Sequence, residues 1–149
     1  KADWIGMIMG RDIMMRWLDV GEDQKHIYNI YQRILTLCNQ EKAIIEGDFF
    51  DLMYANVNGW RFNEHKQYAF LRKAGNELLF IIVNFDHISV DVAINVPSHA
   101  FDFLQIPQMD IYPAVDLLTD KTENISLLPY KATEISVEGC SGKILKIKL

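Results

Sequence analysis

Two pairs of aspartates lie close together in this sequence and have the residue type that a hydrolase uses as acid and base. They are Asp48 with Asp51 in "GDFFDL", and Asp86 with Asp91 in "NFDHISVD". Hydrolysis of a glycosidic bond needs two carboxylates roughly 5 to 10 Å apart across a cleft, one of them with a raised pKa. All four fall at the ends of predicted strands, where Asp accepts hydrogen bonds from turn backbone. We interpret them as structural and predict no catalytic residue.

Motifs for other chemistries are missing as well. The sequence has no Gly-x-Ser-x-Gly elbow, no phosphate loop and no Gly-x-Gly-x-x-Gly fingerprint. Its histidines and cysteines lack the His-x-x-x-His and Cys-x-x-Cys spacings of metal sites. These residues are His26, His65, His87, His99, Cys38 and Cys140. The sequence therefore predicts surface histidines, two free thiols rather than a disulfide, no metal site and no cofactor.

One aromatic residue is a candidate for carbohydrate binding, because the apolar face of a pyranose stacks on an exposed ring. Trp60 follows the turn dipeptide Asn58-Gly59 and precedes Arg61. Two other interpretations stay open: Trp60 closes one end of the core, or it contacts a neighbouring domain.

Length and composition limit the architecture and the partners. The chain has 149 residues, of which 50% are hydrophobic, enough for one domain with a sizeable core, with or without an appendage. A net charge of −5 gives no basic surface for nucleic acid or an anionic membrane. No apolar run reaches the roughly 18 residues of a membrane-spanning helix. We expect neither nucleic acid nor membrane as a partner.

The first twenty residues, "KADWIGMIMGRDIMMRWLDV", combine Trp4, Trp17 and several methionines with strong helix formers, and Gly21 can end the segment. So many large apolar side chains need a surface to cover. Either the segment packs on its own domain, or it belongs against a body missing from this chain. In the second case, the isolated chain is expected to self-associate.

A clearer helix follows, capped by Asp23 and ending within residues 39–42. Apolar side chains recur at helical spacing and form one stripe that needs to be buried against the sheet or a missing partner. The stripe consists of Ile27, Ile30, Tyr31, Ile34, Leu35 and Cys38.

After Gly47 the apolar period shortens to that of strands. Residues 78–85 form a nearly unbroken apolar run, typical of a central strand covered on both faces, and Gly75-Asn76 predicts a hairpin turn before it. The other predicted strands span residues 49–55, 68–72, 90–96, 114–118, 124–128, 133–138 and 143–149. We predict a mainly β chain: an antiparallel β-sandwich of about eight strands, of Greek-key type, preceded by one or two α-helices.

The order of these features resembles the α-amylase superfamily of glycoside hydrolases. The segment "IYNIYQRILTLCNQEKAIIEGDFFDL" is similar to the junction between the last barrel helix and the C-terminal β domain. The matching residues are Tyr31, Leu35, Leu37, Ala43, Ile44, Gly47, Phe49 and Leu52. "YAFLRKAGNELLFIIVNFD", "VDVAINVP" and "AVDLLTDKTENISLLPYKATEISV" resemble later strands of that domain, so the likeness covers roughly residues 27–138.

The resemblance implies a non-catalytic C-terminal accessory domain of an α-amylase-like enzyme that acts on starch-like α-glucans. In that family the catalytic carboxylates lie on a (β/α)₈ barrel, which 149 residues cannot contain. Residues 1–42 would be the helical end of the barrel and residues 43–149 the β-sandwich domain, which stabilises the barrel and assists glucan binding. The partner would be the missing barrel. The alternative is a stand-alone carbohydrate-binding or protein-interaction module.

Overall fold

A computed structural model describes residues 21–149, so the predicted helix over residues 1–20, with its tryptophans, lies outside the described part. Residues 37–149 form one compact unit, and the described residues of the other unit, 21–36, form most of helix α2 (Glu22–Gln40). Helix α2 ends within the predicted range and begins one residue before the predicted cap, Asp23. Among the described helices, none is long and apolar enough to cross a membrane.

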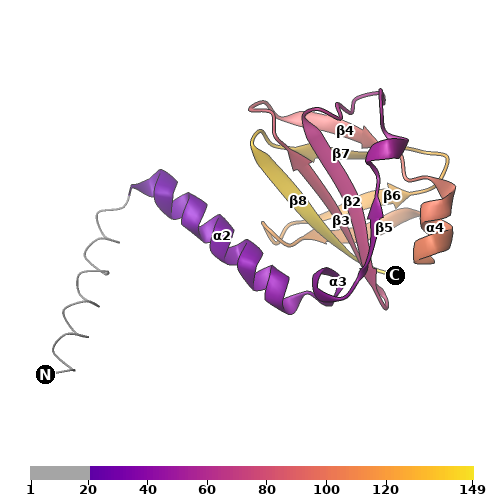
Figure 1. Ribbon diagram of the computed structural model, residues 1–149, viewed down its shortest axis with the longest axis horizontal. Helices are drawn as coiled ribbons and strands as arrows, with labels where there is room; N and C mark the ends of the chain where they lie inside the picture. Colours follow the sequence, from indigo (N-terminus) through magenta and orange to yellow (C-terminus); the bar gives the residue numbers. More distant parts are fainter. Residues whose placement is uncertain (1–20) are drawn as a thin grey trace, which may run out of the picture. The chain divides into compact units, whose positions relative to one another are not determined.

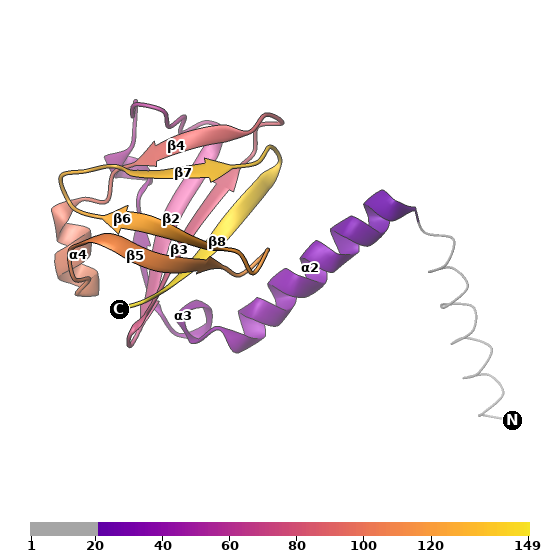
Figure 2. The ribbon, with the colours of Figure 1, turned by 180° about the vertical axis from the view of Figure 1, so that it is seen from behind.

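The larger unit is a sandwich of two antiparallel sheets, as predicted (Figure 1). The described residues form eight strands: β1 (Asp48–Asp51), β2 (Gln67–Ala74), β3 (Glu77–Asn84), β4 (Val90–Ile94), β5 (Met109–Asp116), β6 (Thr122–Leu127), β7 (Thr133–Val137) and β8 (Ser141–Lys148). Six of them lie in the order β1-β2-β3-β8-β5-β6, and β4 pairs with β7 in the second sheet. Figure 2 shows the β4–β7 pair crossing over the longer strands from the other side.

The main core lies between the two sheets. Alternate residues of β4 and β7, among them Val92 and Ile135, face Leu71, Phe80 and Leu145 of the six-stranded sheet, and all are buried. The alternation therefore assigns one face of each strand to the core, as the sequence pattern predicts.

Strand β3 is buried on both faces over residues 78–82, as predicted, whereas Phe85 at the end of the predicted run lies beyond the strand and is 68% exposed. Leu78 and Phe80 point into the sandwich, whereas Leu79 and Ile81 belong to a second cluster with Leu37 and other residues on the opposite face of the sheet. We call this opposite side the outer face. The hairpin turn before β3 is also confirmed, with Gly75 at φ 58°, a left-handed conformation that glycine adopts without strain.

The short helix α3 (Lys42–Ile45) packs on the outer face. Arg72 of β2 donates hydrogen bonds from Nε to the Ala43 carbonyl, 2.8 Å, and from Nη2 to the Gly47 carbonyl, 2.7 Å. Ala43 is fully buried. A Cβ atom on Gly47 would lie 2.2 Å from the Ala43 carbonyl oxygen, so only glycine fits at the exit of this helix. The junction residues Ala43 and Gly47 thus have packing roles.

Two sequence predictions need correction. The strand predicted over residues 49–55 stops at Asp51, and a 3₁₀ turn, η1 (Met53–Ala55), follows because the Asp51 carboxylate accepts a hydrogen bond from the Met53 backbone, 3.0 Å. Helix α4 (Ser98–Leu104) was not predicted at all. It is only seven residues long and has no side-chain cap, and burial of Ala100, Phe101 and Leu104 stabilises it.

The apolar stripe predicted for α2 consists of side chains that are exposed in this chain. They are Ile27, Ile30, Tyr31, Ile34, Leu35 and Cys38. Leu37, which lies outside the stripe, is buried. Burial of the stripe against the sheet or a missing partner stays a prediction. Cys38 and Cys140 are free thiols, as predicted.

Candidate functional site

The outer face of the six-stranded sheet carries an aromatic group beside α3. Tyr68 and Phe70 alternate along β2, and Phe49 on β1 lies next to them, with ring centroids 5.7 Å apart for Tyr68–Phe70 and 5.3 Å for Phe49–Phe70. Across the sheet, Tyr68 pairs with Val83 and Phe70 pairs with Ile81. We call Phe49, Tyr68, Phe70 and Val83 the aromatic face.

The aromatic face is only partly covered. Tyr68 is 36% exposed and Phe49 is 48% exposed, while Phe70 and Val83 are half-buried. Helix α3 covers the neighbouring Leu79. Apolar rings that alternate with core residues on a central part of a sheet are unusual at a water-facing surface. This face therefore has the composition of an interface.

Asn84 and Asp86 form a buried polar cluster at the end of β3. Asn84 is fully buried and donates from Nδ2 to the carbonyls of Ile88, 2.8 Å, and Glu138, 3.1 Å. Its Oδ1 accepts hydrogen bonds from the Gln67 side chain, 3.1 Å, and from the Asp86 backbone, 3.1 Å. Asn84 thereby satisfies the backbone where β3 leaves the sheet, which accounts for the Asn-Phe-Asp motif as a strand end.

Asp86 completes this cluster. Lys66 Nζ donates a 2.6 Å hydrogen bond to Asp86 Oδ2, and the His87 backbone donates to Oδ1, 2.9 Å. The hydrogen bond from Lys66 is the main cause of a lowered pKa of the Asp86 carboxyl, although burial partly opposes it. This carboxylate is held ionised, in contrast to the raised pKa that a glycosidase acid needs.

Of the remaining candidate carboxylates, Asp48 is exposed at the start of β1, and the other two are engaged locally. The Asp51 carboxylate serves the η1 turn, and Asp91 accepts a hydrogen bond from Ser136 and pairs with Arg61 at 3.4 Å. Within residues 21–149, no group of three or more His, Cys, Asp or Glu side chains is placed to hold a metal ion. The four histidines are exposed, as predicted.

Trp60 lies in the turn between η1 and β2 and is 69% exposed. The prediction that it closes one end of the core is therefore wrong. The Arg61 guanidinium lies 5.1 Å from the centroid of the indole ring, and the same Arg61 donates from Nε to the Asp91 carbonyl, 3.0 Å. Arg61 thus holds the ring at the surface through a cation–π contact.

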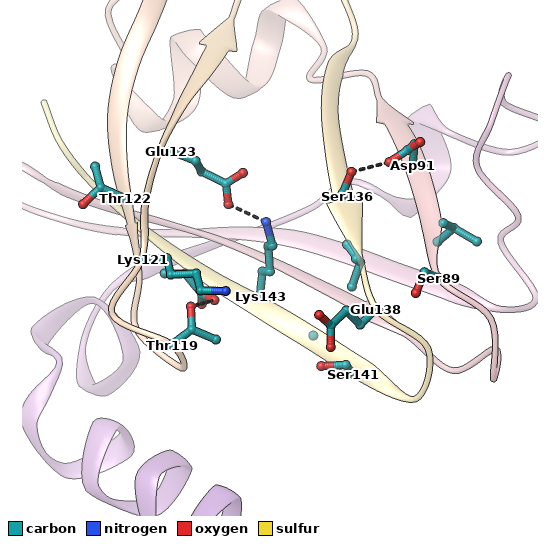
Figure 3. A pocket seen from close by; sticks show the side chains of 14 residues that line it. Ser89, Asp91, Thr119, Lys121, Thr122, Glu123, Ser136, Glu138, Ser141 and Lys143 are labelled. Carbon is teal, nitrogen blue, oxygen red and sulfur yellow. Dashed lines mark hydrogen bonds and ion pairs between the residues drawn. The ribbon is translucent and has the colours of Figure 1, made fainter.

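A polar hollow of about 470 Å³ opens between the two sheets, next to the β5–β6 hairpin (Figure 3). Two of its charged side chains form an ion pair, with Lys143 Nζ 2.6 Å from Glu123 Oε1, and Ser136 donates to Asp91. Thr119, Lys121 and Glu138 line the rest. The hollow presents hydroxyls and paired ions without an aromatic platform.

Sequence reasoning missed a second hollow, which lies between β1, η1 and α4. Phe49, Phe50, Asp51, Tyr54, His99, Asp102 and Phe103 line it. The hydroxyl of Tyr54 and Nε2 of His99 are 2.5 Å apart, although the two residues are 45 positions apart in sequence. Because α4 was not predicted, no sequence signal could place His99 and Phe103 beside β1.

The fold is shared with parts of solved α-amylase structures. A maltogenic α-amylase, AmyB, from Thermotoga neapolitana matches 87% of this chain with 27% of its own, with a TM-score of 0.63 and 16% identity. An α-amylase from Anoxybacillus matches 83% of this chain with 23% of its own, with a TM-score of 0.56 and 14% identity. AmyP, solved in complex with maltose, matches 85% of this chain with 21% of its own, with a TM-score of 0.58 and 19% identity.

These likenesses show that the fold of this chain is shared with parts of α-amylase structures, which is the fold that the sequence resemblance implied. The chain spans only about a quarter of the length of the structures that it matches. No protein-family model matches the sequence. No curated protein matches it either.

The Asp86–Lys66 pair predicts acid-dependent stability. Since the folded pKa of Asp86 lies below the unfolded value of about 3.9, the pair stabilises the fold above that pH and loses this effect as pH falls through the folded pKa. We expect Asp86→Asn and Lys66→Met to be less stable than the wild type at pH 6, with the gap closing toward pH 2, in urea unfolding followed by tryptophan fluorescence. Lys148→Met, an exposed lysine on β8, is the control. A constant gap across this range would contradict the assignment.

Proposed function

We propose that this chain is the C-terminal accessory part of an α-amylase-like glycoside hydrolase acting on α-glucans. In this proposal, residues 1–42 are the helical end of a catalytic barrel and residues 43–149 are the accessory β-sandwich. The observation that carries the proposal is the uncovered apolar surface: the aromatic face beside α3 and the exposed stripe of α2. The fold shared with about a quarter of each α-amylase chain supports it.

The physical role follows from the energetics of that surface. An amphipathic helix gains most of its stability when its apolar stripe is buried. The five exposed apolar side chains of α2 make no such contribution while they face water. Covering a ring as exposed as Tyr68 would stabilise the assembly by about 1–2 kcal/mol. A barrel that covers both surfaces would thus be stabilised by this domain, which contributes no catalytic group.

The rival is a stand-alone carbohydrate-binding or protein-interaction module. The reading frame upstream of Lys1 separates the two. An encoded (β/α)₈ barrel with three carboxylate motifs supports the accessory role, and a gene that encodes the sandwich without a barrel supports the rival.

The variant Tyr68→Ser tests the accessory role directly. We expect it to lower the Tm of the full-length gene product more than the Tm of the isolated chain, because the ring would be buried further only against the barrel. The extra loss should correspond to about 1–2 kcal/mol, or several degrees. Tyr130→Ser, which removes a ring that is 79% exposed in the turn after β6, should shift both Tm values little. Equal shifts for Tyr68→Ser in the two proteins would contradict the proposal.

Glucan binding at Trp60 is a second candidate function, favoured by the exposure of the ring and its support by Arg61. One face of the indole contacts Arg61, which leaves the opposite face for a pyranose. We expect Trp60→Ala to weaken binding of maltooligosaccharides in a calorimetric titration, with Tyr130→Ala as the control. Equal, negligible binding by the wild type and Trp60→Ala would remove this candidate.

A further inference from the structure

The hollow between β1, η1 and α4 has the size and lining of a small-molecule site. Its volume is about 710 Å³, within the range of roughly 300–1,000 Å³ that is typical of ligand pockets. Helix α4 forms one side and the strand–turn segment of β1 and η1 forms the other. Both sides belong to the compact unit of residues 37–149.

Three rings gather around Phe50 in this hollow. The Phe50 centroid lies 5.1 Å from His99, 6.0 Å from Phe103 and 6.3 Å from Tyr54, all within the usual range of ring contacts. Phe103 is 59% exposed and Tyr54 is 53% exposed. Phe50 thus anchors two rings that present their surfaces to solvent, as a stacking platform requires.

Polar groups are placed at the edge of this platform. Burial, with a smaller effect from the Asp51 charge, raises the pKa of Tyr54, so its hydroxyl stays protonated, and it shares a hydrogen bond with His99 Nε2. A hydroxyl and a neutral imidazole each have a donor and an acceptor, so in either direction of this bond the pair keeps one donor and one acceptor for a ligand. The carboxylates of Asp51 and Asp102 also line the hollow and are acceptors. Vicinal hydroxyl groups of a sugar both donate and accept hydrogen bonds, so they can pair with donors and acceptors that lie beside an exposed ring.

We propose that the hollow of Phe50, Tyr54, His99, Asp102 and Phe103 binds a pyranose unit of an α-glucan. The apolar face of the sugar stacks on Phe103 and Tyr54, and its hydroxyls exchange hydrogen bonds with His99 and Asp102. A methylated ammonium would also suit the rings and carboxylates. It cannot use the donor that the Tyr54–His99 pair keeps, which favours the sugar. The choice of an α-glucan over other pyranosides rests on the proposed function, whereas the choice of a pyranose rests on the hollow itself.

Titration of the whole chain with maltohexaose, cellohexaose and choline chloride, followed by calorimetry and by ¹H–¹⁵N spectra, tests this proposal. We expect maltohexaose to bind and to shift the amide signals of η1 and α4. Phe103→Ala should weaken binding about tenfold, and Tyr54→Phe, which keeps the ring but removes the hydroxyl, should weaken it about threefold to tenfold. Tyr130→Ala should leave the shifts in η1 and α4 unchanged. Because the substituted rings are largely exposed, we expect the variants to fold, and thermal unfolding should show a Tm close to that of the wild type.

Three results would overturn the proposal: no shift with maltohexaose, tighter binding of cellohexaose or choline, or undiminished binding by Phe103→Ala. The titration needs no barrel, so it is independent of the test of the accessory role. If Tyr68→Ser shifts the Tm of the isolated chain and of the full-length gene product equally, the accessory role fails. If maltohexaose still binds at the hollow in that case, the sugar site stands.

Discussion

The close contact between α3 and the outer face of the sheet is the constraint on which the arrangement depends. Gly47 has no room for a Cβ atom because the Ala43 carbonyl oxygen would lie 2.2 Å away. The same carbonyl and that of Gly47 accept hydrogen bonds from the Arg72 guanidinium, which is fixed on β2. Lys146 of β8 adds an ion pair with Glu41, with Nζ 2.7 Å from Oε2. The hydrogen bond between these two groups is the main cause of the raised pKa of Lys146. Two strands therefore hold the end of the helical segment against the sheet.

This contact divides the outer face into two parts. Near α3, side chains such as Leu79 and Ala43 are buried within the chain. Farther along the same strands, Tyr68 and Phe49 remain partly exposed. A sheet that buries one half of an apolar face and leaves the other half open is suited to a second body that continues the cover. In the proposal above, that second body is a catalytic barrel.

The sequence predicts most of the sandwich because its signals are local. Strict alternation identifies β4 and β8, and Gly75 marks the β2–β3 turn because its φ of 58° suits glycine. The sequence does not predict α4, since seven residues without a side-chain cap are stabilised mainly by burial. The hollow beside α4 could not be predicted either, because Tyr54 and His99 meet only through the fold. Burial of Leu37 was not predicted either, because this residue lies outside the apolar stripe of α2.

Hydroxyl-radical footprinting of the isolated chain and of the full-length gene product measures most directly whether the aromatic face is covered by a barrel. The account predicts that Tyr68 and Phe49 are oxidised in the isolated chain and protected in the full-length protein. Tyr130, in the turn after β6, should be oxidised equally in both and serves as the internal reference. Equal oxidation of Tyr68 and Phe49 in the two proteins would contradict the account, because no second body would then cover the open half of the sheet.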